Sequence, residues 1–153
     1  MNSRYGLQIR SATGADAEGV AELMGSGGVP VAPTLLEARI EALRGERGMV
    51  LLAEEWGPPS GIAVGTWFRT LDSDSPTAQL SMLLVGPESR RRGIGRLLLK
   101  AFAQAARAAG CGSLVCVVAG EEEGLPAFLQ ASGFSTQGAL HVRPLRKKPK
   151  VGR

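Results

Sequence analysis

Residues that commonly bind metals or act as nucleophiles are scarce in this sequence. Its 153 residues include one histidine, His141, and two cysteines, Cys111 and Cys116. The five-residue offset between the cysteines matches no common zinc or redox spacing, so we predict no metal site. The two thiols are expected to be free and buried, as in a reducing compartment.

Long apolar runs and aromatic residues are also scarce. No stretch approaches the roughly 18 apolar residues that a membrane-spanning helix requires. Residues 1–5 lack the apolar segment of a signal peptide. The sequence therefore predicts a cytoplasmic protein without a membrane partner. Aromatic residues make up 5% of the chain, which leaves few rings to stack on bases, and we do not expect a nucleic-acid partner.

Basic charge is present but unevenly distributed. The formal net charge is +4, and six basic residues follow His141 with no acidic partner among them. A second basic cluster lies inside the chain, at Arg90–Arg92 and Arg96. Because no internal repeat or long linker interrupts the sequence, we predict one domain over residues 1–145 and a solvated basic tail over 146–153.

The hydrophobic pattern predicts an α/β protein with a central mixed sheet flanked by helices. Capping boxes at Thr13 with Asp16 and at Thr34 with Glu37 predict two early helices. The unit at 79–118 should join two parallel strands through a right-handed helical crossover, with the second strand covered on both faces. Further helices are expected at 92–109 and 125–132, and strands at 7–10, 49–53, 62–68, 79–85, 113–118 and once or twice within 134–145.

The segment from Leu83 to Leu99 has the pattern of an anion-binding site. An apolar strand ends at Val85, and a glycine-containing loop leads directly into an amphipathic helix. The first N–H groups of a helix have no acceptor within it and lie at the positive end of its dipole. Because Gly93 and Gly95 lack Cβ atoms, an anion can approach the backbone closely. The neighbouring arginines add positive charge.

The run Arg90-Arg91-Arg92-Gly93-Ile94-Gly95 resembles the acetyl-coenzyme A signature of the GCN5-related N-acetyltransferase (GNAT) superfamily. That signature has Gln or Arg, two variable residues, Gly, a variable residue, then Gly or Ala. The expected order of elements and the Gly133-Phe134 pair are also similar, so the resemblance covers nearly the whole chain. It implies the GNAT acyl-coenzyme A N-acyltransferase fold, with acetyl-coenzyme A as co-substrate. The coenzyme-binding residues that it implies are Leu83, Leu84, Val85, Arg90, Arg91, Arg92, Gly93, Ile94, Gly95 and Arg96.

The sequence departs from this family at its usual catalytic positions. Many relatives carry a tyrosine where this chain has Leu129, and a common glutamate falls near Ser81 or Met82. An asparagine often seen in the family corresponds to Glu122. Cys116 is expected in the core, and Trp56 and Trp67 are expected to pack. No catalytic residue is assigned, and the remaining candidates to remove a proton are Glu54, Glu55, Asp72, Asp74, Glu121, Glu122, Glu123 and His141.

The function predicted first is transfer of an acetyl group to a primary amine of a small molecule, amino acid or peptide. The acidic pairs and triplets at 54–55 and 121–123 would favour a cationic acceptor. A non-catalytic acyl-coenzyme A sensor is the alternative, because Leu129 lacks a hydroxyl group. A nucleic-acid-associated protein that uses Arg90–Arg92 and the tail ranks last. Dimers are common in the family, which leaves a homodimer open.

Overall fold

The computed structural model describes residues 6–44, 47–90, 92–117 and 124–146. The chain divides into two compact units, Met1–Val117 and Val118–Arg153. The prediction of one domain over 1–145 stays a prediction. No helix within the described ranges is long and apolar enough to cross a membrane.

The first unit is built on a five-stranded mixed sheet. The strands lie side by side in chain order, and the pairs β1–β2, β2–β3 and β3–β4 are antiparallel. β5 runs parallel to β4, as the strand–helix–strand pattern predicts. The mixed sheet with flanking helices is therefore confirmed. The strands are β1 (Gln8–Ser11), β2 (Gly48–Glu54), β3 (Gly61–Phe68), β4 (Thr77–Val85) and β5 (Ser113–Cys116).

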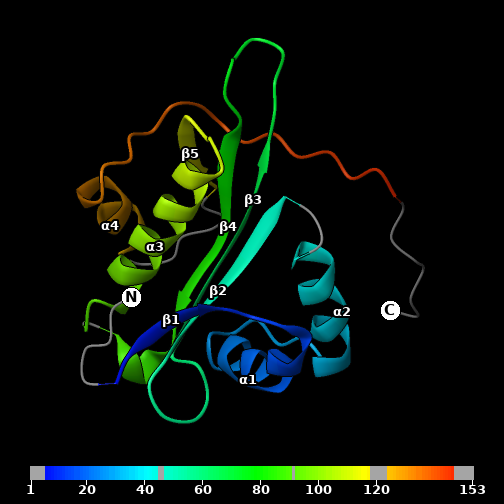
Figure 1. Cartoon of the computed structure of the whole chain (residues 1–153), viewed down its shortest axis with the longest axis vertical. Helices are drawn as coiled ribbons and strands as arrows, with labels where there is room; N and C mark the ends of the chain where they lie inside the picture. The colour runs from blue at the N-terminus through cyan, green and yellow to red at the C-terminus, as the bar shows by residue number, and fades with distance from the viewer. Residues whose placement is uncertain (1–5, 45–46, 91, 118–123, 147–153) are drawn as a thin grey trace. The chain divides into compact units, whose positions relative to one another are not determined.

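Helices cover both faces of this sheet (Figure 1). On one face lie α1 (Ala17–Ser26) and α2 (Pro33–Arg44), which follow the short 3-10 helix η1 (Gly14–Asp16). On the other lies α3 (Ile94–Ala108), which follows η2 (Pro87–Ser89). Alternate residues of each strand feed the two cores, because successive side chains of a strand point to opposite faces. The core under α1 and α2 contains Val20, Leu23, Leu36, Ile40, Val50, Leu52, Ile62 and Leu84.

The opposite core depends on the close approach of α3 to glycines in β3. A Cβ at Gly61 would lie 2.9 Å from Leu98 Cδ1 and 3.1 Å from Ile94 Cγ2. A Cβ at Gly65 would overlap the ring of Phe102 and the carbonyl oxygen of Gln79. Phe102 is fully buried. Because these two glycines have no side chain, α3 lies directly on the sheet, with its polar face outward.

Replacing Gly65 with Ala should destabilise the protein by about 1–3 kcal/mol, because Phe102 and the β4 backbone must shift to admit a methyl group. The measurement is urea unfolding followed by far-UV circular dichroism. Gly25→Ala is the matched control, since a Cβ at this exposed position of α1 meets no atom within 4 Å. The control should be neutral or slightly stabilising. Equal stability of the two variants would show that α3 does not need Gly65.

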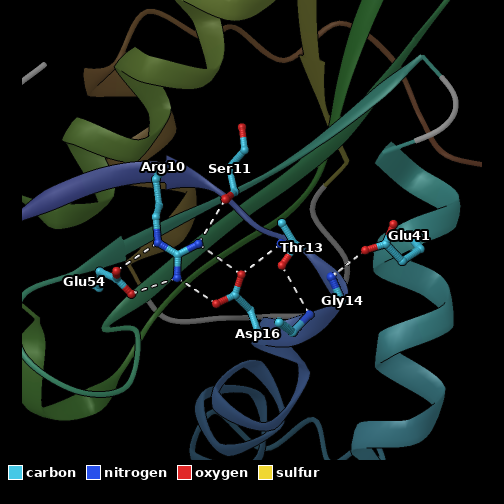
Figure 2. A network of polar contacts seen from close by, with 8 residues as sticks. Arg10, Ser11, Thr13, Gly14, Asp16, Glu41 and Glu54 are labelled. Carbon is cyan, nitrogen blue, oxygen red and sulfur yellow. Dashed lines mark hydrogen bonds and ion pairs between the residues drawn. The ribbon is translucent and has the colours of Figure 1, made fainter.

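A polar network fastens the N-terminal segment to the rest of the first unit (Figure 2). The Arg10 guanidinium donates to Asp16 Oδ1 at 2.7 Å and to Glu54 Oε2 at 2.9 Å. Asp16 also accepts the Thr13 N–H at 2.8 Å, which completes the predicted capping box. Glu41 on α2 accepts the Gly14 N–H at 2.7 Å. These contacts join β1, η1, β2 and α2, and the Arg10 side chain holds the pKa of Asp16 below its ordinary value.

Asp16→Asn should lower the free energy of unfolding by about 1 kcal/mol at pH 7, a modest value because the pair is partly exposed to water. Since the folded-state pKa of Asp16 is depressed, its stabilising effect is present above the unfolded pKa of about 3.9 and is lost as the pH falls through the folded pKa. Urea unfolding of both proteins from pH 7 to about pH 2.5 measures this. The two stabilities should converge in acid. A difference that stays constant across the range would contradict the role of the ionised carboxylate.

Three local predictions are wrong. α2 begins at Pro33, so Thr34 lies inside its first turn and cannot cap it; proline is favoured at that position because the first N–H of a helix has no partner there. β5 is not covered on both faces, because Val115 is 40% exposed. Both cysteines are free but only partly buried.

The second unit contains α4 (Leu125–Ala131), with Pro126 in its first turn as predicted. The helix ends where Gly133 adopts φ +98° and the Phe134 N–H bonds to the Leu129 carbonyl at 3.0 Å. The closing strands expected within 134–145 are wrong, because residues 134–146 form no strand. The segment contains Gly138 at φ +142°, outside the extended region, and Pro144, which has no N–H for a ladder. The tail at 147–153 lies outside the described residues.

Candidate functional site

β4 and β5 separate part of the way along their length. Their parallel pairing runs from Thr77 with Ser113 to Leu80 with Cys116. At the next residue, Ser81, the register between β3 and β4 shifts, since Val64 pairs with Met82 and Gly65 pairs with Leu80. The extra residue is a β-bulge, which bends a strand and increases its twist. Among the described residues, no strand pairs with β4 beyond Leu80 on the β5 side.

The bulge leaves main-chain groups of β4 directed at this open edge. Gly86 donates its N–H to the Ser60 carbonyl at 2.9 Å, which continues the ladder with β3. In an antiparallel ladder the hydrogen-bonded pairs alternate, so Leu84 and Met82 also direct their peptide groups to β3. Leu83 and Val85 direct theirs to the opposite side. Leu84 instead contributes a buried side chain to the core under α1 and α2.

The open edge leads to the start of α3. Gly93 precedes the helix with φ +80° and ψ 10°, a left-handed conformation that favours glycine. The first intrahelical bond runs from the Leu97 N–H to the Gly93 carbonyl at 3.0 Å. The N–H groups of residues 93–96 therefore have no acceptor within the helix and lie at its positive end. Ile94 is 1% exposed and anchors this end to the sheet, whereas Arg96 is exposed.

Two arginines of the predicted cluster contact the protein itself. Arg90 Nε donates to the Val85 carbonyl at 3.2 Å. Arg92 forms an ion pair with Glu55, which follows the last residue of β2. Arg91 lies outside the described residues. The coenzyme-binding role of this cluster stays a prediction. The partner of Arg92 comes from 37 residues earlier, and no local pattern indicates it.

An open strand edge that leads to a helix start with free N–H groups suits an extended coenzyme with phosphate at one end. Residues 20–134 match the model of the Acetyltransferase (GNAT) family. This is more than half of the chain, and the protein belongs to the GNAT family of acetyltransferases. No curated protein sequence matches it.

Solved structures similar to this chain include several named acetyltransferases. An aminoglycoside N-acetyltransferase in complex with coenzyme A shares 20% identity and a TM-score of 0.78, over 95% of this chain and 98% of that one. An aminoglycoside acetyltransferase from an uncultured soil metagenomic sample, in complex with sisomicin, shares 16% identity and a TM-score of 0.75, over 93% of this chain and 97% of that one. Glucosamine-6-phosphate N-acetyltransferase from Arabidopsis thaliana shares 16% identity and a TM-score of 0.76, over 92% of this chain and 99% of that one. At these identities the likeness shows a common fold.

The carboxylates considered as proton acceptors are mostly engaged or remote. Glu54 shares the single positive charge of Arg10 with Asp16, so this cluster keeps one net negative charge, and Glu55 pairs with Arg92. Asp72 and Asp74 lie exposed in the β3–β4 turn. Residues 121–123 lie outside the described ranges. His141 is exposed on the segment after α4.

The other candidate side chains also lack catalytic features. Burial raises the pKa of the Cys116 thiol, so its nucleophilic thiolate form is disfavoured at neutral pH. Trp67 packs against Phe102 with ring centroids 6.3 Å apart, as predicted, whereas Trp56 is 79% exposed. Leu129 is buried on α4. Among the described residues, no group of three or more His, Cys, Asp or Glu could hold a metal ion.

Gly93→Glu should weaken coenzyme A binding by about 10- to 100-fold, because a carboxylate would stand beside the free N–H groups and repel phosphate. The measurement is isothermal titration with coenzyme A. Gly110→Glu is the matched control, since Gly110 follows the same helix, has φ +94° and is likewise exposed. The control introduces the same kind of backbone strain and the same charge after the C-terminal end of α3. Unchanged affinity of the Gly93 variant would remove this helix start from the site.

Proposed function

We propose that the protein transfers the acetyl group of acetyl-coenzyme A directly to a primary amine of a small molecule, amino acid or peptide. The observation that carries this proposal is the open β4 edge beside the free N–H groups of α3. In this proposal the pantetheine arm bonds to the main chain of Leu83 and Val85. The diphosphate binds at residues 91–96, where main-chain N–H groups need no particular side chain.

The proposed reaction is a nucleophilic substitution at the thioester carbon. The amine lone pair attacks this carbon, a C–N bond forms, and the C–S bond breaks to release the coenzyme A thiolate. The nitrogen loses a second proton as the amide forms, and this proton balances the thiolate as free thiol. A lysine-like amine has a pKa of about 10.4 and must first lose a proton, which water can accept. The positive end of α3 would favour the departing thiolate. The raised pKa of Cys116 supports direct transfer over an acyl-cysteine intermediate.

The ion pairs of the chain and the names of the similar structures indicate which amines to test first as acceptors. Glu55 is paired with Arg92, and Glu54 shares Arg10 with Asp16, so the pair at 54–55 gives little reason to prefer a polycationic substrate. Two of the similar structures are named for aminoglycosides and one for glucosamine-6-phosphate. Amino sugars are therefore the first compounds to test, followed by amino acids and peptides. A cytoplasmic location, expected from the sequence, fits the two free cysteines.

The test is titration of the purified protein with acetyl-coenzyme A, followed by thiol release in the presence of each amine. One-to-one binding with amine-dependent thiol release is the expected result. Binding without release for any amine would favour a non-catalytic acyl-coenzyme A sensor, the reading that Leu129 also favours. Absence of binding would overturn the proposal.

A further inference from the structure

We infer that Glu55 is a positioning residue, which binds Arg92 and thereby holds the loop before α3 in its coenzyme-binding shape. This inference rests on the proposed function and deepens it. It changes the role of Arg92, because a basic cluster beside an anion site is ordinarily read as a set of phosphate ligands. The Arg92 position is also a variable one in the signature that the run 90–95 resembles.

The exposure of the two partners supports a permanent pair. The Glu55 side chain is 14% exposed, whereas that of Arg92 is 47% exposed. If Arg92 moved to a phosphate, the Glu55 carboxylate, most of whose side chain is buried, would be left without its partner. Binding to a phosphate would therefore be less favourable for Arg92, which must first leave Glu55, than for an arginine that has no ion-pair partner.

Glu55 is also well supported by the backbone around it. The Ser60 N–H bonds to the Ala53 carbonyl at 2.7 Å, and the Ser60 carbonyl accepts the Gly86 N–H at 2.9 Å. These bonds close the loop between β2 and β3 and join it to the end of β4. Gly61, the next residue, lies against Ile94 and Leu98 of α3. The carboxylate thus projects from a segment that is already fixed to both elements of the proposed site.

The other end of the pair lies where a fixed backbone matters most. Arg92 directly precedes Gly93, whose left-handed conformation turns the chain into α3. Arg90 is bonded to the Val85 carbonyl at the other end of the loop. The two arginine contacts therefore brace the segment from both ends. The N–H groups of α3 remain available to the diphosphate, and their orientation is set before the coenzyme arrives.

The test is a charge exchange measured by titration with coenzyme A. Glu55→Arg and Arg92→Glu should each weaken binding by about tenfold, and the double variant should recover to within about threefold of the wild type. If Arg92 contacts phosphate, the double variant will bind as weakly as Arg92→Glu, and the inference is wrong. Circular dichroism establishes that each variant is folded.

A conservative variant of Glu55 shows whether this residue positions the loop or only competes with phosphate for Arg92. Glu55→Gln should weaken binding, because the loop loses its ion pair; tighter binding would mean that Glu55 merely competes with phosphate for Arg92, and would overturn the inference. Arg107→Glu is the matched control for Arg92→Glu, since it makes the same charge change in the last turn of α3, and it should leave the affinity unchanged. Absence of coenzyme A binding by the wild type would overturn the proposed function and this inference together, whereas wild-type binding that the exchange does not restore overturns the inference alone.

Discussion

The close contact between α3 and β3 is the constraint on which the rest of the first unit depends. Gly61 and Gly65 remove two side chains from the face that α3 covers, and Phe102 occupies the space beside Gly65. The helix is therefore held against the sheet at one depth and cannot slide without leaving a cavity. Because Ile94 lies in the same contact, the first turn of α3 is fixed beside the end of β4. Packing of the core thus determines where the proposed anion site lies.

A second constraint is the bulge at Ser81 in β4. The bulge falls directly after Leu80, the last residue of β4 that pairs with β5. A bulge bends a strand, and among the described residues the peptide groups of Leu83 and Val85 pair with no strand on that side. The strand edge and the helix start each present main-chain groups without a partner in the sheet or the helix. In the proposed function, the amide-containing arm of the coenzyme would bond to the first and its diphosphate to the second.

The sequence predicted elements whose pattern is local. The five described strands, α3 and α4, and the capping box of Thr13 with Asp16 follow from hydrophobic period and cap chemistry. The errors occur where distant residues decide the outcome. The sequence predicts closing strands within 134–145, but a strand forms only with a neighbour, and Leu140 and Val142 in this segment are exposed. Glu54 and Glu55 looked like free carboxylates because Arg10 and Arg92 are remote from them in the sequence.

The same distinction explains why the coenzyme can be inferred from this chain and the amine cannot. Recognition through N–H groups of a helix start requires glycines at fixed spacing, which a linear motif records. Recognition of an acceptor requires side chains brought together from separate loops, and no spacing encodes their convergence. The usual tyrosine position holds Leu129, which has no proton to give a thiolate. If turnover occurs, the thiolate must be stabilised by the field of α3 or protonated by water, so the rate should depend on the helix start more than on any single acidic side chain.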